Sequence, residues 1–312
     1  MSPKLCLVTG VDAQMFPQLL LLCGSLRRYS PGLKLHVCDF GLTGPQRAFL
    51  RRRYVLLDTP PEIVPRHAWD YKAALGRYVA QMQAETVVWL DADMIVLSDI
   101  EPPLRLLQEE MAAEGQDVAA ADTGLSIDAL LAAYPAPHFA SLMRGLDRSA
   151  PYLNSGFFLC RSRAFLDQWS AQNQAMHYER LYEQNAFNLV ALADSEKIRI
   201  LDRFRWNLVA NDLRPLPMTV AGDVVVVTTP TGQPLILHAT SNDSARDLAA
   251  VTLPLSLSGR KFETRLRMIR HPQDLLAFQQ ALTQQSIEAD HSRLPNWLRR
   301  GTLLKALQHG GQ

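Results

Sequence analysis

The chain has 312 residues, of which 47% are hydrophobic. This composition is typical of a globular protein with one large domain or two small ones, and it excludes disorder, a collagen helix and a coiled-coil rod. With 32 lysines and arginines against 31 aspartates and glutamates, the formal net charge is +1. No strong field of either sign favours an acidic polymer, so we predict no nucleic-acid partner.

The cysteines and the amino-terminal residues indicate the compartment. The four cysteines have no CxxC spacing and lie in apolar runs, as small buried thiols do. Residues 1–4 lead into an apolar run too short for a signal-peptide core, and no stretch reaches eighteen uninterrupted apolar residues. We therefore expect reduced thiols and a cytoplasmic protein, with peripheral contact with the inner face of a membrane left open.

The first elements are expected to be a strand, a helix and a strand. Residues 5–9 form an apolar run, residues 16–28 have the pattern of a helix that ends before Ser30-Pro31-Gly32, and residues 33–39 form a second apolar run. This order is typical of a parallel α/β sheet, in which ligands bind beyond the carboxyl ends of the strands. Thr9 and Asp12 would lie at that edge.

The same alternation continues along the chain. We expect helices near residues 45–53, 71–83 and 163–182, and apolar strand-like runs at 54–57, 86–97, 117–121, 157–160, 198–201, 224–227 and 235–237. No repeat interrupts the series, which predicts one α/β domain over residues 1–250. From Arg260 onward the sequence has nine basic and four acidic residues. We therefore predict a separate, basic helical extension over residues 251–312.

Two aspartates one residue apart, Asp91 and Asp93, make the run at 86–97 the most informative. Period-two alternation in a strand points both side chains to one side, where like charges repel unless a cation lies between them. Oxygen ligands suit Mg²⁺ or Mn²⁺, which would in turn hold substrate phosphates. The apolar residues before and after the pair favour a buried metal site over two carboxylates that only cap a strand.

A phosphotransferase is an alternative interpretation of the same two aspartates. In such enzymes the first aspartate of an Asp-x-Asp is the nucleophile and the second the acid/base. They usually carry the motif on the first strand and follow it with Thr or Val two residues on. Here the motif follows a middle strand and Ile95 stands at that place, so the sequence favours the metal site.

The residues Trp89-Leu90-Asp91-Ala92-Asp93-Met94-Ile95-Val96 resemble the metal-binding strand of nucleotide-sugar glycosyltransferases of the GT-A fold, most of all glycosyltransferase family 8. Other segments resemble that family in the same order: residues 7–12, 25–28, 35–42, 153–159, 183–188, 204–207 and 235–238. The resemblance covers roughly residues 5–240. It implies an α/β, GT-A type (Rossmann-like) mixed and mostly parallel sheet flanked by helices, followed by the helical extension.

The resemblance implies a role for each matching residue. The metal ligands would be Asp91, Asp93 and His238, which bind Mn²⁺ or Mg²⁺. The nucleotide and donor contacts would be Thr9, Asp12, Lys72, Asp91 and Asn154. The catalytic positions would be Glu183 and Gln184, near the anomeric carbon, with transfer that retains configuration. Plainer interpretations stay open for several of them: a turn or N-cap for Thr9 and Asp12, and a solvated lysine or loop for the others.

The sequence departs from the family after His238. The family usually has Gly and then Lys-Pro-Trp there, and its lysine helps to neutralise the diphosphate, but this chain reads Ala239-Thr240-Ser241-Asn242-Asp243. Arg246 could supply the missing charge, because a guanidinium binds phosphate oxygens well.

We therefore expect a metal-dependent hexosyltransferase. Its donor would be a nucleoside diphosphate sugar, with UDP-hexose preferred, and its acceptor a glycan or lipid-linked hydroxyl. The alternative is a GT-A domain that binds nucleotide or glycan without turnover, which the missing Lys-Pro-Trp favours.

The end of the chain carries a further hypothesis. Basic side chains flank apolar ones around Trp297. The basic residues are Arg293, Arg299, Arg300 and Lys305, and the apolar ones are Leu294, Leu298, Leu303, Leu304 and Leu307. This pattern suits a basic amphipathic helix on anionic lipid. Pro295 and Gly301 shorten any such helix, so packing of the apolar side chains onto the α/β domain remains open as well.

Overall fold

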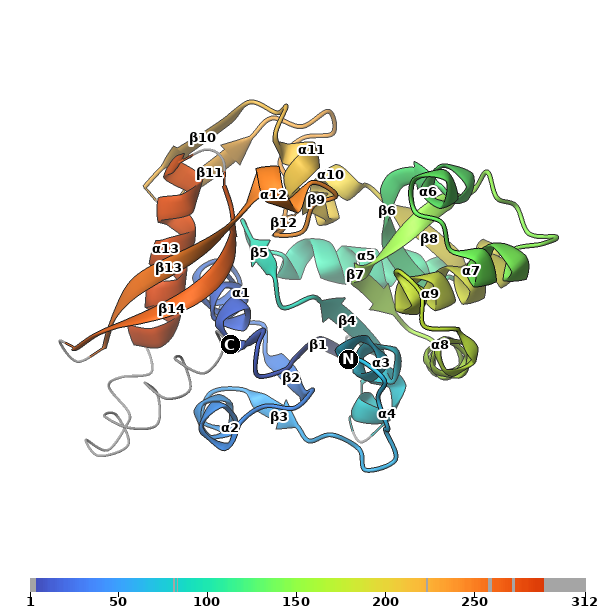
Figure 1. Cartoon of the computed structure of the whole chain (residues 1–312), viewed down its shortest axis with the longest axis horizontal. Helices are drawn as coiled ribbons and strands as arrows, with labels where there is room; N and C mark the ends of the chain where they lie inside the picture. The colour runs from blue at the N-terminus through green and yellow to red at the C-terminus, as the bar shows by residue number, and fades with distance from the viewer. Residues whose placement is uncertain are drawn as a thin grey trace. The chain divides into compact units, whose positions relative to one another are not determined.

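The computed structural model describes residues 4–288 except 81, 83, 223, 258–259 and 271–272. The chain forms two compact units built from alternating segments, and Figure 1 labels the helices and strands along the chain. The first unit contains Met1–Val8, Asp58–Leu90 and Pro103–Arg203, and the second contains Thr9–Leu57, Asp91–Pro102 and Phe204–Gln312. The residues around Trp297, for which we predict a basic amphipathic segment, lie outside the described part of the chain.

In the first unit the sheet is built on the buried strand β4 (Thr86–Leu90). β4 pairs in parallel with β1 (Leu5–Val11) and antiparallel with β7 (Pro151–Cys160). β7 pairs antiparallel with β6 (Val118–Ser126), which pairs in parallel with β8 (Ile198–Leu201). Every residue of β4 is buried, which explains its uninterrupted apolar sequence.

Aromatic side chains form much of the core of the first unit. Trp89 of β4 stacks on Phe158, and Phe158 packs edge-on against Trp169 at 5.6 Å between ring centroids. Phe187 packs against both Phe158 and Trp169 and so joins helix α9 to helix α8 and the sheet. The helices of this unit are α3 (Ala68–Ala73), α4 (Leu75–Val79), α5 (Glu101–Ala113), α6 (Ile127–Ala133), α7 (Pro137–Leu142), α8 (Arg163–Ala175), α9 (Tyr182–Ala193) and the 3₁₀ turn η1 (Ser195–Lys197).

The second unit has four groups of strands. A three-stranded sheet has the order β5 (Met94–Val96), β12 (Ile236–His238), β9 (Leu208–Val209), while β2 (Leu35–Asp39) pairs in parallel with β3 (Val55–Leu57). Two hairpins follow, β10 (Met218–Ala221) with β11 (Val224–Val227), and β13 (Leu248–Leu257) with β14 (Arg260–Ile269). The helices are α1 (Phe16–Tyr29), α2 (Gly44–Arg51), α10 (Arg203–Trp206), α11 (Ala210–Leu213), α12 (Ser244–Asp247) and α13 (Gln273–Glu288).

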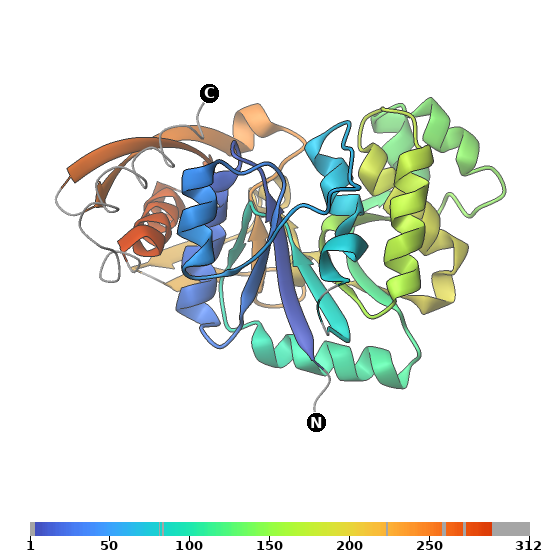
Figure 2. The ribbon, with the colours of Figure 1, turned by 90° about the horizontal axis from the view of Figure 1, so that it is seen from below.

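Helix α13 lies beside the β13–β14 hairpin in both ribbon views (Figure 1 and Figure 2). Its Phe278 and Leu282 join a buried apolar cluster with Leu21 of α1, Ile95 of β5 and Leu237 of β12. The cluster therefore ties helix α13 to β5, which follows Asp93, and to β12, which ends in His238.

The fold is α/β with a mixed, mostly parallel sheet flanked by helices, as the sequence predicts. Three local predictions are wrong. The helix expected at residues 71–83 is two short helices, and the helix expected at 163–182 ends at Ala175, because Met176 is extended and Leu181 takes a left-handed φ of 58° before α9.

The third difference is in the carboxyl-terminal extension. Helix α13 is helical as expected, but residues 248–269 form a hairpin. In β14 the buried Thr264, Leu266 and Met268 alternate with the exposed Arg265 and Arg267, a period of two that favours a strand. The boundary at residue 250 stays a prediction. Among the described helices, none is long and apolar enough to cross a membrane.

Gly24 of α1 sets how closely α13 can approach. A Cβ atom at this position would overlap the backbone carbonyl of Leu282. We therefore predict that Gly24→Ala lowers the free energy of unfolding by about 1–3 kcal/mol through overpacking, measured by urea denaturation. Gly44→Ala in α2 is the matched control, since no heavy atom lies within 4 Å of its added Cβ. Equal stability of the two variants would contradict a close contact between α1 and α13.

Candidate metal and nucleotide-sugar site

Asp91 and Asp93 lie in the turn between β4 and β5, and not on a strand as predicted. The amide of Met94 donates to the carbonyl oxygen of Asp91 at 3.1 Å and closes the turn. β5 pairs antiparallel with β12 in a register that places Met94 opposite His238. The amide of Ala239 donates to the carbonyl oxygen of Asp93 at 2.9 Å, so the backbone itself holds His238 beside the two aspartates.

The side chains of Asp91, Asp93 and His238 converge. One ligand atom from each lies within 4.8 Å of the others. His238 Nε2 is 3.1 Å from Asp93 Oδ1 and 3.9 Å from Asp91 Oδ2. The Asp93 and His238 side chains are almost fully buried, whereas the Asp91 side chain is 27% exposed. The three residues that the sequence analysis assigned to one metal site are thus brought together.

Asn207 orients the imidazole of His238. Its Oδ1 lies 2.8 Å from His238 Nδ1 and is itself buried. An amide oxygen accepts hydrogen bonds only, so Nδ1 carries a proton and Nε2 faces the carboxylates, where it can donate to Asp93 or, once deprotonated, bind a cation through its lone pair. Metal-binding histidines usually donate their second nitrogen to such a partner.

Asp93 has a second neighbour besides His238, the positively charged Arg267 of β14. Arg267 Nη2 donates to Asp93 Oδ2, while His238 occupies the side of Oδ1. Burial tends to raise the pKa of Asp93, but the charge and hydrogen bond of His238, followed by the charge of Arg267, outweigh it and lower the pKa to about 2. Asp93 is therefore a carboxylate at neutral pH.

Two carboxylates and one neutral imidazole nitrogen form a donor set that fits a divalent cation. Carboxylate oxygens suit Mg²⁺ and Mn²⁺, and an imidazole nitrogen suits first-row transition ions. The partly exposed Asp91 leaves one side of the set accessible. The residues present therefore fit a divalent cation such as Mg²⁺ or Mn²⁺.

Other predicted residues of the second unit have different surroundings. Asp12 Oδ1 accepts from the amides of Gln14 and Met15 at 3.0 and 2.8 Å, a local turn at the start of α1 that matches its plainer interpretation. Thr9 is fully buried, and its Oγ1 has no hydrogen-bond partner within the described residues. The guanidinium on Asp93 belongs to Arg267, whereas Arg246 is exposed on α12.

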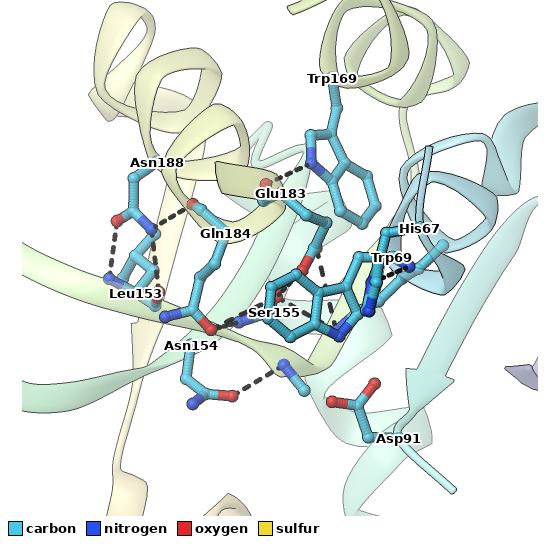
Figure 3. A network of polar contacts seen from close by, with 12 residues as sticks. His67, Trp69, Asp91, Leu153, Asn154, Ser155, Trp169, Glu183, Gln184 and Asn188 are labelled. Carbon is cyan, nitrogen blue, oxygen red and sulfur yellow. Dashed lines mark hydrogen bonds and ion pairs between the residues drawn. The ribbon is translucent and has the colours of Figure 1, made fainter. Parts of the chain in front are cut away.

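The first unit holds a buried polar network around Ser155 of β7. Lys72 Nζ donates to Ser155 Oγ at 3.1 Å and lies 3.9 Å from Glu183 Oε1. Ser155 Oγ donates to Glu183 Oε2 at 3.3 Å, and its amide donates to Gln184 Oε1 at 3.2 Å. Figure 3 shows Ser155 between Glu183 and Gln184. Lys72 is thus buried and paired, and not solvated.

Two asparagines keep this network in register. Asn188 of α9 donates to the carbonyl of Leu153 at 2.9 Å and accepts from its amide at 2.7 Å, which fastens α9 to β7 (Figure 3). Asn154 Oδ1 accepts from the amide of Gly156 at 2.7 Å. The predicted residues Lys72, Asn154, Glu183 and Gln184 therefore lie in one connected region of the first unit.

Ser155, Asn188, Asn207 and Arg267 are the residues that the sequence analysis left without a role. The first three stand inside segments that it singled out by resemblance, so position in a motif was the available signal. Arg267 lies in no motif, and the sequence analysis placed it in a helical extension. The alternation of Leu266 and Met268 with Arg265 and Arg267 was the available signal for a strand.

The fold is that of the GT-A glycosyltransferases. The structure of the galactosyltransferase LgtC in complex with donor and acceptor sugar analogues superposes with a TM-score of 0.54 at 16% identity, covering 94% of this chain and 98% of that one. The apo form of the glycosyltransferase GlyE of Streptococcus pneumoniae TIGR4 has a TM-score of 0.49 at 16% identity, over 98% of this chain and 64% of that one. No protein-family model and no curated protein matches the sequence.

Asn207→Ala tests whether the second histidine nitrogen matters. Loss of the acceptor frees the ring to rotate and to change tautomer, so we predict that Mn²⁺ affinity falls about 10- to 100-fold, measured by isothermal titration calorimetry. Asn211→Ala is the control: Asn211 contacts Asp212 and Asn242 instead, and its loss should leave affinity unchanged. Equal affinity of the Asn207 variant and the wild type would contradict the orienting role.

Proposed function

We propose that the protein is a metal-dependent glycosyltransferase that moves a hexose from a nucleoside diphosphate sugar, preferably UDP-hexose, to a hydroxyl group of a glycan or lipid-linked acceptor. The observation that carries the proposal is the convergence of Asp91, Asp93 and His238 in a chain with the GT-A fold. The superposed galactosyltransferase binds donor and acceptor sugar analogues, which supports the same classes of ligand here. The order of the motifs favours glycosyltransferase family 8.

Asp91, Asp93 and His238 would hold Mn²⁺ or Mg²⁺. When bound, the cation would stabilise the charge that develops on the leaving diphosphate, an effect worth several kcal/mol in a dry site. Asp93 contributes an ionised carboxylate because its pKa is low. Asn207 supports the arrangement by fixing the imidazole of His238. Thr9, whose buried hydroxyl has no hydrogen-bond partner among the described residues, remains our candidate for a nucleoside contact.

The network in the first unit suits sugar hydroxyl groups. The buried Lys72 and Glu183 and the half-buried Gln184 offer a cation, a carboxylate and an amide that support one another. Such preorganised groups bind polar ligands without further ordering. We assign Gln184 and Glu183 to the catalytic positions and Lys72 and Asn154 to the donor sugar. The resemblance to family 8 supports retention of configuration.

An aromatic surface in the first unit favours a glycan acceptor. Trp69 and Tyr178 are 40% and 66% exposed. His67 packs against both rings, at 4.7 and 6.3 Å between centroids. Exposed aromatic faces stack on the apolar face of a pyranose ring. Large apolar side chains that stay exposed together often mark a binding surface.

A GT-A domain that binds nucleotide without turnover is the alternative function. The absence of Lys-Pro-Trp after His238 favours it, whereas the complete set of metal ligands opposes it. Release of free hexose or of a glycosylated acceptor from UDP-hexose separates the two. Metal-dependent UDP binding without turnover under any acceptor would favour the binding module.

Thermal unfolding with UDP tests the donor site directly. Because a ligand at 100 times its Kd stabilises the folded state by about 2.7 kcal/mol, we predict that UDP raises the Tm in the presence of Mn²⁺ and leaves it unchanged in EDTA. Asp91→Asn should abolish the Mn²⁺-dependent shift, while Asp99→Asn, whose carboxylate only caps the amide of Glu101, should retain it. A UDP shift that is as large in EDTA as in Mn²⁺ would contradict a metal-held diphosphate.

The anomeric outcome tests the assignment of Gln184. We expect the first-formed product to keep the anomeric configuration of the donor, observed by proton NMR before mutarotation. An inverted product would remove both the retaining mechanism and the role proposed for Gln184.

A further inference from the structure

The backbone of Arg267 is fastened to helix α1 by one buried side chain. Gln18 Nε2 donates to the carbonyl oxygen of Arg267, and Gln18 Oε1 accepts from the Arg267 amide at 3.1 Å. Gln18 is 3% exposed, and the neighbouring Leu266 and Met268 are buried. Both hydrogen bonds of this side-chain amide are therefore used to fix the position of a single residue on β14.

The side chain of Arg267 lies on the metal-binding carboxylate and remains partly accessible. Nη2 donates to Asp93 Oδ2, yet the side chain is 44% exposed. Within the described part of the chain, Asp93 is the side chain that this guanidinium contacts. A guanidinium carries five N–H donors, so most of them stay available to a ligand that reaches the same carboxylate.

Asp93 would thus be shared between Arg267 and a bound cation. In the free protein Arg267 supplies positive charge to Asp93. If a divalent cation bound beside Arg267, its two positive charges and the one of the guanidinium would face the two carboxylates of Asp91 and Asp93. The cation and Arg267 would then repel each other. A diphosphate removes that conflict, because its oxygens bind both the cation and the guanidinium.

Resting on the proposed function, we propose that Arg267 is the diphosphate-binding cation that replaces the lysine missing after His238, and that it serves as the counter-ion of Asp93 until the nucleotide arrives. The ligand is a nucleoside diphosphate. Arg246, to which the sequence analysis gave this role, is not the residue on Asp93. The coupling is reciprocal: nucleotide strengthens metal binding as much as metal strengthens nucleotide binding.

Arg267→Ala should have opposite effects on the two ligands. Mn²⁺ alone should bind about 2- to 5-fold more tightly, because a partly exposed competing charge is removed. UDP in saturating Mn²⁺ should bind about 10- to 100-fold more weakly, because a charge-assisted hydrogen bond is lost. Isothermal titration of the full-length protein, first with MnCl₂ and then with UDP, measures both. Arg267→Lys keeps the charge without the planar fork and should be intermediate in the second titration.

Two control variants show whether these effects are specific to Arg267. Arg265→Ala removes a cation from the same exposed face of β14, and Arg246→Ala removes the residue first assigned to this role. Both should leave the two affinities within about twofold of the wild type. The Tm of each apo variant shows whether it is folded, and Arg267→Lys tests the proposal if the alanine variant is not.

Each outcome decides the question. Unchanged UDP affinity in Arg267→Ala, with wild-type protein that binds UDP, overturns the phosphate role alone. Weaker binding of Mn²⁺ alone by the same variant overturns the counter-ion role. Failure of the wild type to bind UDP overturns both this inference and the proposed function.

Discussion

The carboxylates of Asp91 and Asp93 lie in one tight turn and repel each other unless positive charge lies beside them. Residues of the second unit supply that charge. Asp93 is buried beside the partly exposed Asp91, and its charge would be costly without a partner. His238 and Arg267 take the two oxygens of Asp93 from different sides. Burial alone would raise the pKa of Asp93, but His238 and Arg267 outweigh the burial and lower the pKa. A divalent cation would therefore bind beside carboxylates that already stabilise positive charge.

Each partner reaches that place through a different part of the architecture. The register of β12 against β5 fixes His238, and Asn207 fixes its ring. Arg267 depends on longer-range packing: Gln18 of α1 holds its backbone, and α1 is held against α13 across the contact at Gly24. A helix far from the carboxylates thus contributes to their electrostatics by positioning one strand.

The sequence predicted that Asp91 and Asp93 lie side by side because both follow a buried run, and the resemblance to family 8 implied His238 as the third ligand of the same site. It could not predict Arg267, which is separated from Asp93 by 174 residues and lies in a strand whose alternation was obscured by its net positive charge. It also missed the left-handed Leu181 that separates α8 from α9, since a non-glycine residue gives no local signal for that conformation. Local sequence patterns predicted most helices and strands. The charges around Asp93 depend on contacts between segments that are far apart in the sequence, and local patterns do not show those contacts.

The most direct measurement is a crystal structure of the protein with Mn²⁺ and UDP, with anomalous data collected above the manganese absorption edge. We predict an anomalous peak coordinated by Asp91, Asp93 and His238, at about 2.0–2.2 Å from each ligand atom, with the UDP diphosphate on the same ion. Density for UDP with no anomalous peak at these residues, and with His238 still hydrogen-bonded to Asp93, would contradict the metal site on which the proposed function depends.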